Sequence, residues 1–135
     1  MSIYLDHAAT SPLQQEALTA LINQLKEVGN PSSLHTFGRD TRKALEEARE
    51  KIAKFVSAAP SEIIFTSSGT ESNNLAIKGL FWKSNRKVIV VSAIEHHAVL
   101  DPAKWLAEKE GAEVIEIPVS YDGVIDLNHL QNLVS

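Results

Sequence analysis

The chain has 135 residues, 44% of them hydrophobic, and a formal net charge of −4 at pH 7. This length fits one domain, and the absence of a concentrated basic patch argues against nucleic-acid binding. With no cysteine in the sequence, the chain has no disulfide, thiolate metal site or cysteine nucleophile of its own. No apolar run approaches the roughly 20 residues that span a membrane, and no secretory signal opens the sequence, so we expect a cytoplasmic protein.

An N-terminal arm, residues 1–12, is predicted to precede the first helix. Ser11, Pro12 and Gln14 are typical of a helix start, with Ser11 as the cap, proline at the first helical position and Gln14 completing a capping box. Apolar residues then recur at helical spacing as far as Val28. We therefore expect the first helix to run from about residue 13 to residue 28.

The residues that follow predict a stop, a loop and a second helix. Gly29, followed by asparagine and proline, is expected to end the first helix in the left-handed conformation. A polar loop spans residues 31–38. An amphipathic pattern with alternating charges then predicts a second helix over residues 39–56, with one solvated face.

Strands and helices alternate in the rest of the chain. The apolar runs predict strands at 63–66, 87–93 and 113–119, and the segments between and after them predict helices at 75–85, 98–110 and 127–134. This alternation indicates right-handed βαβ units, hence an α/β fold with a parallel-rich sheet and helices packed on it. The Glu and apolar residues of 113–119 suggest one exposed face, and Asp126 is expected to cap the last helix. Three strands are few for such a sheet, so we expect the chain to be the first part of a larger domain.

The stretch TSSGTESNN, residues 66–74, lies where the first strand gives way to a helix. A helix start carries unpaired backbone N–H groups and the positive end of the helix dipole. Gly69 would let the backbone approach a ligand, and Ser67, Ser68 and Thr70 add hydroxyl groups. These are the ingredients of a phosphate cradle. A plain strand-to-helix turn with Thr70 as the N-cap fits the pattern equally well.

Two adjacent histidines, His96 and His97, follow the second strand. In an open parallel sheet, ligands bind beyond the carboxyl ends of the strands, where the Ser67–Thr70 turn should also lie. The pair does not form a chelate as a helical H-x-x-x-H pair does, so no metal site is predicted. Taken alone, the pattern favours surface-loop histidines over a ligand-binding role. His7 and His35 carry weaker signals, in a small-residue turn and a polar loop.

Five segments together resemble the NifS/IscS-like cysteine desulfurases of the class V aminotransferase family, which depend on pyridoxal phosphate. They are YLDHAATSP at 4–12, GNPSS at 29–33 with His35 and Gly38, IFTSSGTESNNLA at 64–76, EHHAVL at 95–100 and GVID at 123–126. They occur in family order over nearly the whole chain. The resemblance implies the large domain of a fold-type I transferase, with residues 13–135 as its first part and with the remainder and a small C-terminal domain beyond Ser135.

The resemblance also implies roles for individual residues. Gly69 and Thr70 match the segment that binds the cofactor phosphate, and His96 matches the histidine that stacks on the pyridine ring and takes part in proton movement. His97 is then a neighbour, and Asn30 is expected near the substrate carboxylate. The family more often has glycine or another small residue where this chain has Ser68. A positive φ at that position would strain a serine.

The implied reaction converts L-cysteine to L-alanine and passes the sulfur to an enzyme cysteine as a persulfide, for iron–sulfur clusters or tRNA thiolation. In the family, the Schiff-base lysine, the aspartate that pairs with the pyridine nitrogen and the mobile cysteine all lie beyond the point that matches Ser135, so this chain alone is expected to be inactive. A homodimer and a sulfur-acceptor protein are implied as partners. Two alternatives remain: another class V enzyme, such as a selenocysteine lyase or an aminotransferase, and a non-catalytic dimerisation module.

Overall fold

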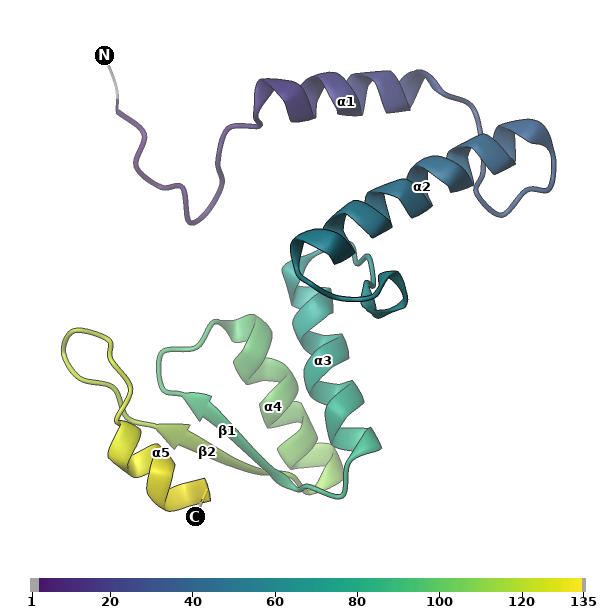
Figure 1. Cartoon of the computed structure of the whole chain (residues 1–135). Helices are drawn as coiled ribbons and strands as arrows, with labels where there is room; N and C mark the ends of the chain where they lie inside the picture. The colour runs from purple at the N-terminus through teal and green to yellow at the C-terminus, as the bar shows by residue number, and fades with distance from the viewer. Residues whose placement is uncertain (1–2, 135) are drawn as a thin grey trace. The chain divides into compact units, whose positions relative to one another are not determined.

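The computed structural model describes residues 3–134, which divide between Ile64 and Phe65 into two compact units. Unit 1 holds α1 (Gln15–Lys26), α2 (Thr36–Phe55) and a short 3₁₀ turn, η1 (Pro60–Glu62). Unit 2 holds α3 (Gly69–Lys83), β1 (Val88–Ser92), α4 (His97–Glu110), β2 (Glu113–Ile117) and α5 (Leu127–Val134), as Figure 1 shows. No helix among residues 3–134 is long and apolar enough to cross a bilayer. The predicted arm boundary at residue 12 stays a prediction.

Helix α1 is shorter at both ends than the sequence predicts. Gln14 is its N-cap, with an extended backbone and no side-chain cap, so the expectation that Ser11 caps the helix is wrong. Since a capping oxygen must reach an N–H two or three residues on, the extended backbone of Gln14 leaves Ser11 outside the helix. Glu27 is also extended and ends the helix before Gly29, which does not adopt a left-handed conformation.

Gly29 and Gly38 are required by close packing in unit 1. A Cβ on Gly29 would collide with the Thr41 hydroxyl and the Phe37 carbonyl. A Cβ on Gly38 would lie 2.7 Å from the Ser33 Cβ and 2.8 Å from the Asn30 carbonyl oxygen, far inside normal contact distance. These glycines allow the 30–38 loop to fold back against the start of α2.

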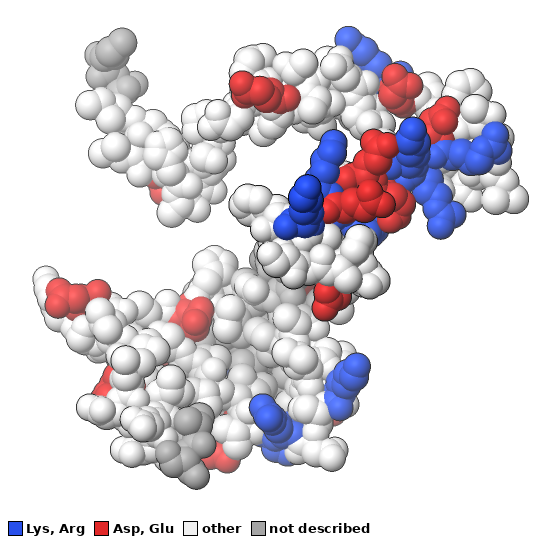
Figure 2. Space-filling view, in the orientation of Figure 1, with Lys and Arg blue, Asp and Glu red and all other residues white. Residues whose placement is uncertain are grey.

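Helix α2 begins at Thr36, three residues before the predicted start, because His35 caps it. The His35 Nδ1 accepts a hydrogen bond from the Gly38 N–H at 3.4 Å. Acidic and basic side chains are interspersed along α2 in Figure 2, and two ion pairs, Lys43–Glu47 at 3.8 Å and Arg49–Glu46 at 3.1 Å, run along the helix. The predicted solvated face is confirmed.

Unit 2 contains the predicted βαβ unit. Strands β1 and β2 pair in parallel, with Val88 opposite Glu113 and Ser92 opposite Ile117, and α4 connects them. The continuous β-branched sequence of β1 is typical of a strand in a parallel sheet. Helix α4 ends at Gly111, whose positive φ of 70° supplies the left-handed cap. The α/β class and the strands at 87–93 and 113–119 are therefore confirmed.

The predicted strand at 63–66 is wrong. These residues belong to no strand, and the sheet among residues 3–134 has two strands, β1 and β2. An extended segment becomes a strand only when a neighbour pairs with it, and β1 pairs with β2 alone. Ile64 stays 68% exposed as a result.

The core of unit 2 lies where α3 packs on α4 and α4 packs on the strands. Phe81, Leu106 and Ala112 form a buried cluster, with Ile77 and Ile89 packed against it. Leu106 is fully buried. This cluster fixes α3 beside α4, and so fixes where the N-termini of both helices lie.

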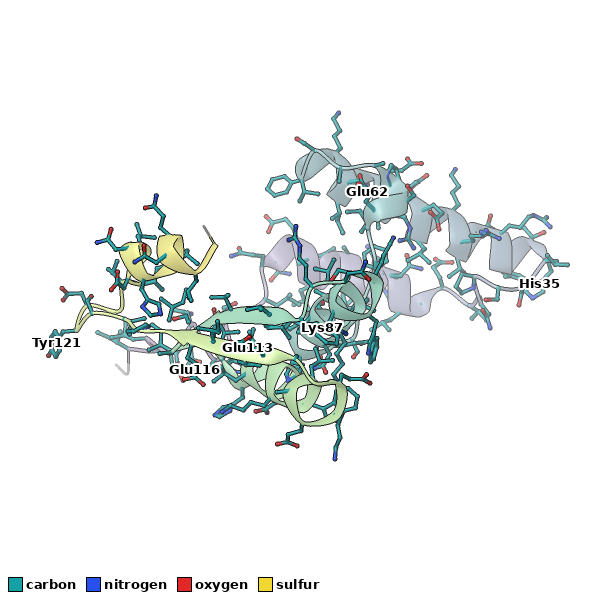
Figure 3. The ribbon with its side chains drawn as sticks, turned by 90° about the horizontal axis from the view of Figure 1, so that it is seen from below. His35, Glu62, Lys87, Glu113, Glu116 and Tyr121 are labelled. Carbon is teal, nitrogen blue, oxygen red and sulfur yellow. The ribbon has the colours of Figure 1, made fainter. Side chains whose placement is uncertain are left out.

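Figure 3 shows Lys87 and Glu113 at the same end of the sheet, where the Glu113 N–H donates to the Lys87 carbonyl at 2.8 Å. Glu113 and Glu116 are both exposed. Because they are three residues apart in a strand, they point to opposite faces, so the exposed residues of β2 do not share the one exposed face that the sequence suggests. The predicted cap of α5 is confirmed, since an Asp126 oxygen accepts from the Asn128 and His129 N–H groups at 3.0 Å.

We predict that Gly38→Ala destabilises the full-length gene product by about 1–3 kcal/mol, the usual effect of overpacking. Gly79→Ala is the matched control, because a Cβ there meets no atom within 4 Å. It should stabilise α3 by about 0.5–1 kcal/mol, as expected when alanine replaces glycine inside a helix. Urea unfolding measures both changes, and a neutral Gly38→Ala would contradict the packing described for the 30–38 loop.

Candidate functional site

Ser68, and not Thr70, is the N-cap of α3. The Ser68 Oγ accepts the Glu71 N–H at 3.2 Å, and α3 begins at Gly69. The alternative in which Thr70 caps the helix is therefore wrong. Thr70 instead lies in the first turn of α3, with its side chain at the surface of a pocket.

Ser68 has an extended backbone, with φ −164° and ψ 164°. Any residue adopts this conformation without strain. The strain that a positive φ would impose on a serine does not arise, because the turn does not use a positive φ there. The loop can therefore accept serine without becoming looser.

The start of α3 offers donors to a ligand. Within residues 3–134, the N–H groups of Gly69 and Thr70 take no part in a hydrogen bond with the protein, nor does the Thr70 hydroxyl. A Cβ built on Gly69 would meet no atom within 4 Å. The open space beside Gly69 and these donors fit an anionic group at the positive end of the helix dipole.

Ser67 does not contribute the free hydroxyl that the sequence predicts. Its N–H and its Oγ both donate to a single carboxylate oxygen of Glu71, at 2.7 and 2.6 Å. The side-chain bond and then the backbone bond from Ser67 hold the pKa of Glu71 below its ordinary value of 4.5. Glu71, which sequence reasoning left without a role, is thus an ionised partner of the turn.

His96 is the N-cap of α4. Its Nδ1 accepts the Ala98 N–H at 3.0 Å. Because Nδ1 acts as the acceptor, the neutral ring carries its proton on Nε2. The cap fixes the orientation of the imidazole, and within residues 3–134 no hydrogen bond involves its Nε2. No helix-cap pattern in the sequence pointed to this role, since histidine is an uncommon N-cap.

His97 is the first residue of α4 and is largely exposed. Its Nδ1 lies 3.6 Å from an Asp101 oxygen, one turn along the helix. The His96 and His97 rings are 6.4 Å apart at an interplanar angle of 72°. In the part of the chain that the structure describes, no three histidine or carboxylate side chains are grouped so that they could hold a metal ion.

Thr70 and His96 line one open pocket of about 330 Å³ in unit 2. The remaining lining residues are Asn74, Lys78, His97, Ala98, Asp101, Pro102 and Trp105. Thr70, Asn74 and Lys78 are spaced four residues apart, so they share one face of α3. The Lys78 ammonium lies 4.4 Å from the Trp105 ring centroid, which links that face of α3 to α4. Sequence reasoning missed these residues, although the four-residue spacing after Thr70 could have indicated them.

The weaker sequence candidates all belong to unit 1. His7 contacts Tyr4 edge to face, with ring centroids 5.2 Å apart. The Asn30 side chain accepts the Ser32 N–H at 2.9 Å, and His35 caps α2. A second hollow, of about 220 Å³, is lined by residues of α1, α2 and their connection and contains none of the three. Their expected roles stay predictions.

The sequence matches the family described as Aminotransferase class-V over residues 3–135. It is 49% identical to the IscS-like cysteine desulfurase of Mycobacterium tuberculosis, covering 95% of this chain and 34% of that protein. It is 54% identical to the cysteine desulfurase IscS of Dictyoglomus turgidum, covering 96% and 33%.

Comparison with solved structures points to the same family as the relatives found by sequence. A NifS-like protein superposes with a TM-score of 0.85 at 37% identity, over 94% of this chain and 35% of that one. A structure described as SspA in complex with cysteine gives a TM-score of 0.85 at 35% identity, over 99% and 39%. The chain therefore belongs to the class V aminotransferase family, and it spans about a third of the length of the curated relatives it matches.

We predict that Glu71 makes the stability of the protein depend on pH. Because its pKa is lower in the folded state, its contribution is fully present above the unfolded value of about 4.5 and is lost as the pH falls through the folded-state pKa. The free energy of unfolding of wild type relative to Glu71→Gln should be steady above that pH and shrink below it. Urea unfolding of the full-length gene product across this range measures the difference. A difference that stays constant or grows toward acid would contradict the assignment.

Proposed function

We propose that this chain is the N-terminal third of a pyridoxal-phosphate-dependent cysteine desulfurase. The observation that carries the proposal is 49–54% identity, over nearly the whole chain, to relatives named as cysteine desulfurases. The pocket shared by Thr70 and His96 supports it, because one site then offers both an anion-binding helix start and an imidazole. The full protein would convert L-cysteine to L-alanine.

In this proposal the start of α3 holds the phosphate of the cofactor. The Gly69 and Thr70 N–H groups and the Thr70 hydroxyl are uncommitted within residues 3–134. A dianionic phosphate there would accept charge-assisted hydrogen bonds, which are shorter and stronger than neutral ones. A Cβ built on Gly69 would meet no protein atom within 4 Å, so the protein leaves space on that side of the residue.

His96 would lie against the cofactor ring. The Ala98 N–H holds its Nδ1, so the imidazole is fixed at the pocket by α4 and keeps its proton on Nε2. A ring held in this way can stack on a planar heterocycle and can give or take a proton at Nε2. When bound, pyridoxal phosphate supplies an electron sink for the substrate carbon.

The sulfur chemistry requires residues outside this sequence, which contains no cysteine. In the proposed reaction a thiolate of the full protein attacks the substrate sulfur, and the carbon–sulfur bond breaks with its electron pair passing to the carbon. That carbon takes up a proton and becomes the methyl group of alanine, while the sulfur remains as a persulfide on the attacking cysteine. A sulfur-acceptor protein, for iron–sulfur cluster assembly or tRNA thiolation, would then take it. We further propose that the full protein is a cytoplasmic homodimer.

We predict that the full-length gene product takes up pyridoxal phosphate and releases sulfide from L-cysteine when a reductant is present, with alanine as the second product. Sulfide and alanine are assayed together. A protein without pyridoxal phosphate would contradict the proposal. Release of selenide from selenocysteine without sulfide from cysteine, or amino-group transfer alone, would favour another class V activity.

We predict that Thr70→Val weakens the affinity of the full-length apoprotein for pyridoxal phosphate by about tenfold or more, the usual effect of losing a hydrogen bond to a charged group. The affinity for pyridoxal, which lacks the phosphate, should change little. Thr70→Ser keeps the hydroxyl and serves as the control. If Thr70→Val lost affinity for pyridoxal phosphate and for pyridoxal to the same extent, the role of Thr70 in phosphate binding would be contradicted.

A further inference from the structure

Three side chains lie around the first turn of α3, those of Thr66, Glu71 and Ser72, and we refer to them together as the clamp. None of the three lines the pocket of Thr70 and His96. All three bond to Ser67 or Ser68, the residues immediately before the free donors of the site. The clamp therefore acts on the site from outside it.

The first part of the clamp holds the Ser68 carbonyl. Its oxygen lies 3.1 Å from the Thr66 Oγ1 and 3.2 Å from the Ser72 Oγ, and it accepts the Ser72 N–H at 3.1 Å. The two hydroxyls are also 2.6 Å from each other. With one hydroxyl proton used between them, the other remains to bond the carbonyl.

Fixing this carbonyl also fixes the next N–H. The peptide bond is planar and trans, so the Gly69 N–H points opposite to the Ser68 C=O. Because Ser72 and Thr66 hold the carbonyl toward the body of the helix, the Gly69 N–H points the opposite way, out from the N-terminal end of α3. Without these hydrogen bonds, the Ser68–Gly69 peptide group could rotate about its flanking bonds, and its N–H would lose this direction.

The second part of the clamp removes competing donors. The Glu71 carboxylate takes both the N–H and the hydroxyl of Ser67, at 2.7 and 2.6 Å. In the same turn, the Glu71 N–H is bound to the Ser68 Oγ. Among residues 67–71, the N–H groups of Ser68, Gly69 and Thr70 then have no hydrogen-bond partner within residues 3–134, and those of Gly69 and Thr70 lie in the first turn of α3.

We propose that Glu71 and Ser72 are positioning residues that orient the Gly69 and Thr70 donors for the cofactor phosphate through Ser67 and the Ser68–Gly69 peptide. This inference rests on the proposed function. A positioning role for Glu71 and Ser72 differs from a purely stabilising role in one measurable respect. A lost cap weakens the binding of every ligand of the pocket to the same extent, whereas a misaimed N–H weakens only the binding of a ligand that carries a phosphate.

The experiment compares two ligands on the full-length apoprotein, pyridoxal phosphate and pyridoxal. Titration by absorbance or fluorescence gives a dissociation constant for each, and their ratio isolates the phosphate contribution. Glu71→Ala and Ser72→Ala should each lower the preference for pyridoxal phosphate about tenfold, because charge-assisted hydrogen bonds depend on alignment. Ser72→Thr retains the hydroxyl and should restore the preference.

Glu108→Gln is the matched control, since Glu108 is exposed near the other end of α4 and does not line the pocket. It should leave the ratio unchanged. Circular dichroism identifies any variant that fails to fold. If one of the two alanine variants fails to fold, the other still tests the inference. If wild type binds pyridoxal phosphate and both alanine variants keep the wild-type ratio, the clamp inference is overturned. If wild type does not bind pyridoxal phosphate, the proposed function itself fails.

Discussion

The packing of α3 on α4 is the constraint on which the candidate site depends. Phe81 and Leu106 join the two helices in the buried core of unit 2. Because each helix begins on the same side of that core, Thr70 at the start of α3 and His96 at the start of α4 line one pocket. The start of α3 and an imidazole are thus brought together by apolar contacts that lie away from the pocket.

Capping decides what each helix start can offer a ligand. A helix leaves its first N–H groups unpaired, and both α3 and α4 satisfy some of them with side chains, Ser68 in one case and His96 in the other. In the first turn of α3, the N–H groups of Gly69 and Thr70 have no hydrogen-bond partner within residues 3–134. In α4 the N-cap is His96, the proposed catalytic side chain, so the hydrogen bond that caps the helix also orients the imidazole ring.

The sequence predicted the elements whose stability is local or whose pattern is strong. The β-branched run of β1, the glycine stop of α4 at Gly111 and the Asp126 cap all appear as expected. The sequence also placed Thr70 and His96 at one site, but for a reason that is only half right. His96 follows β1 as expected, whereas Thr70 reaches the pocket through the packing of α3 on α4 and not at the end of a strand.

The misses share a physical cause. The extended backbone at Gln14 removed the cap predicted for Ser11, and residues 63–66 lie outside the two-stranded sheet that the structure describes within residues 3–134. Ser67 was expected to offer its hydroxyl, but Glu71 takes it. Each outcome depends on which partner a polar group reaches in three dimensions, and residue spacing does not reveal that.

A crystal structure of the full-length gene product grown with pyridoxal phosphate tests the central claim most directly. The account predicts phosphate oxygens within hydrogen-bond distance of the Gly69 N–H and the Thr70 hydroxyl, with the His96 ring stacked on the pyridine. A cofactor bound away from Thr70, or one whose ring does not touch His96, would contradict it.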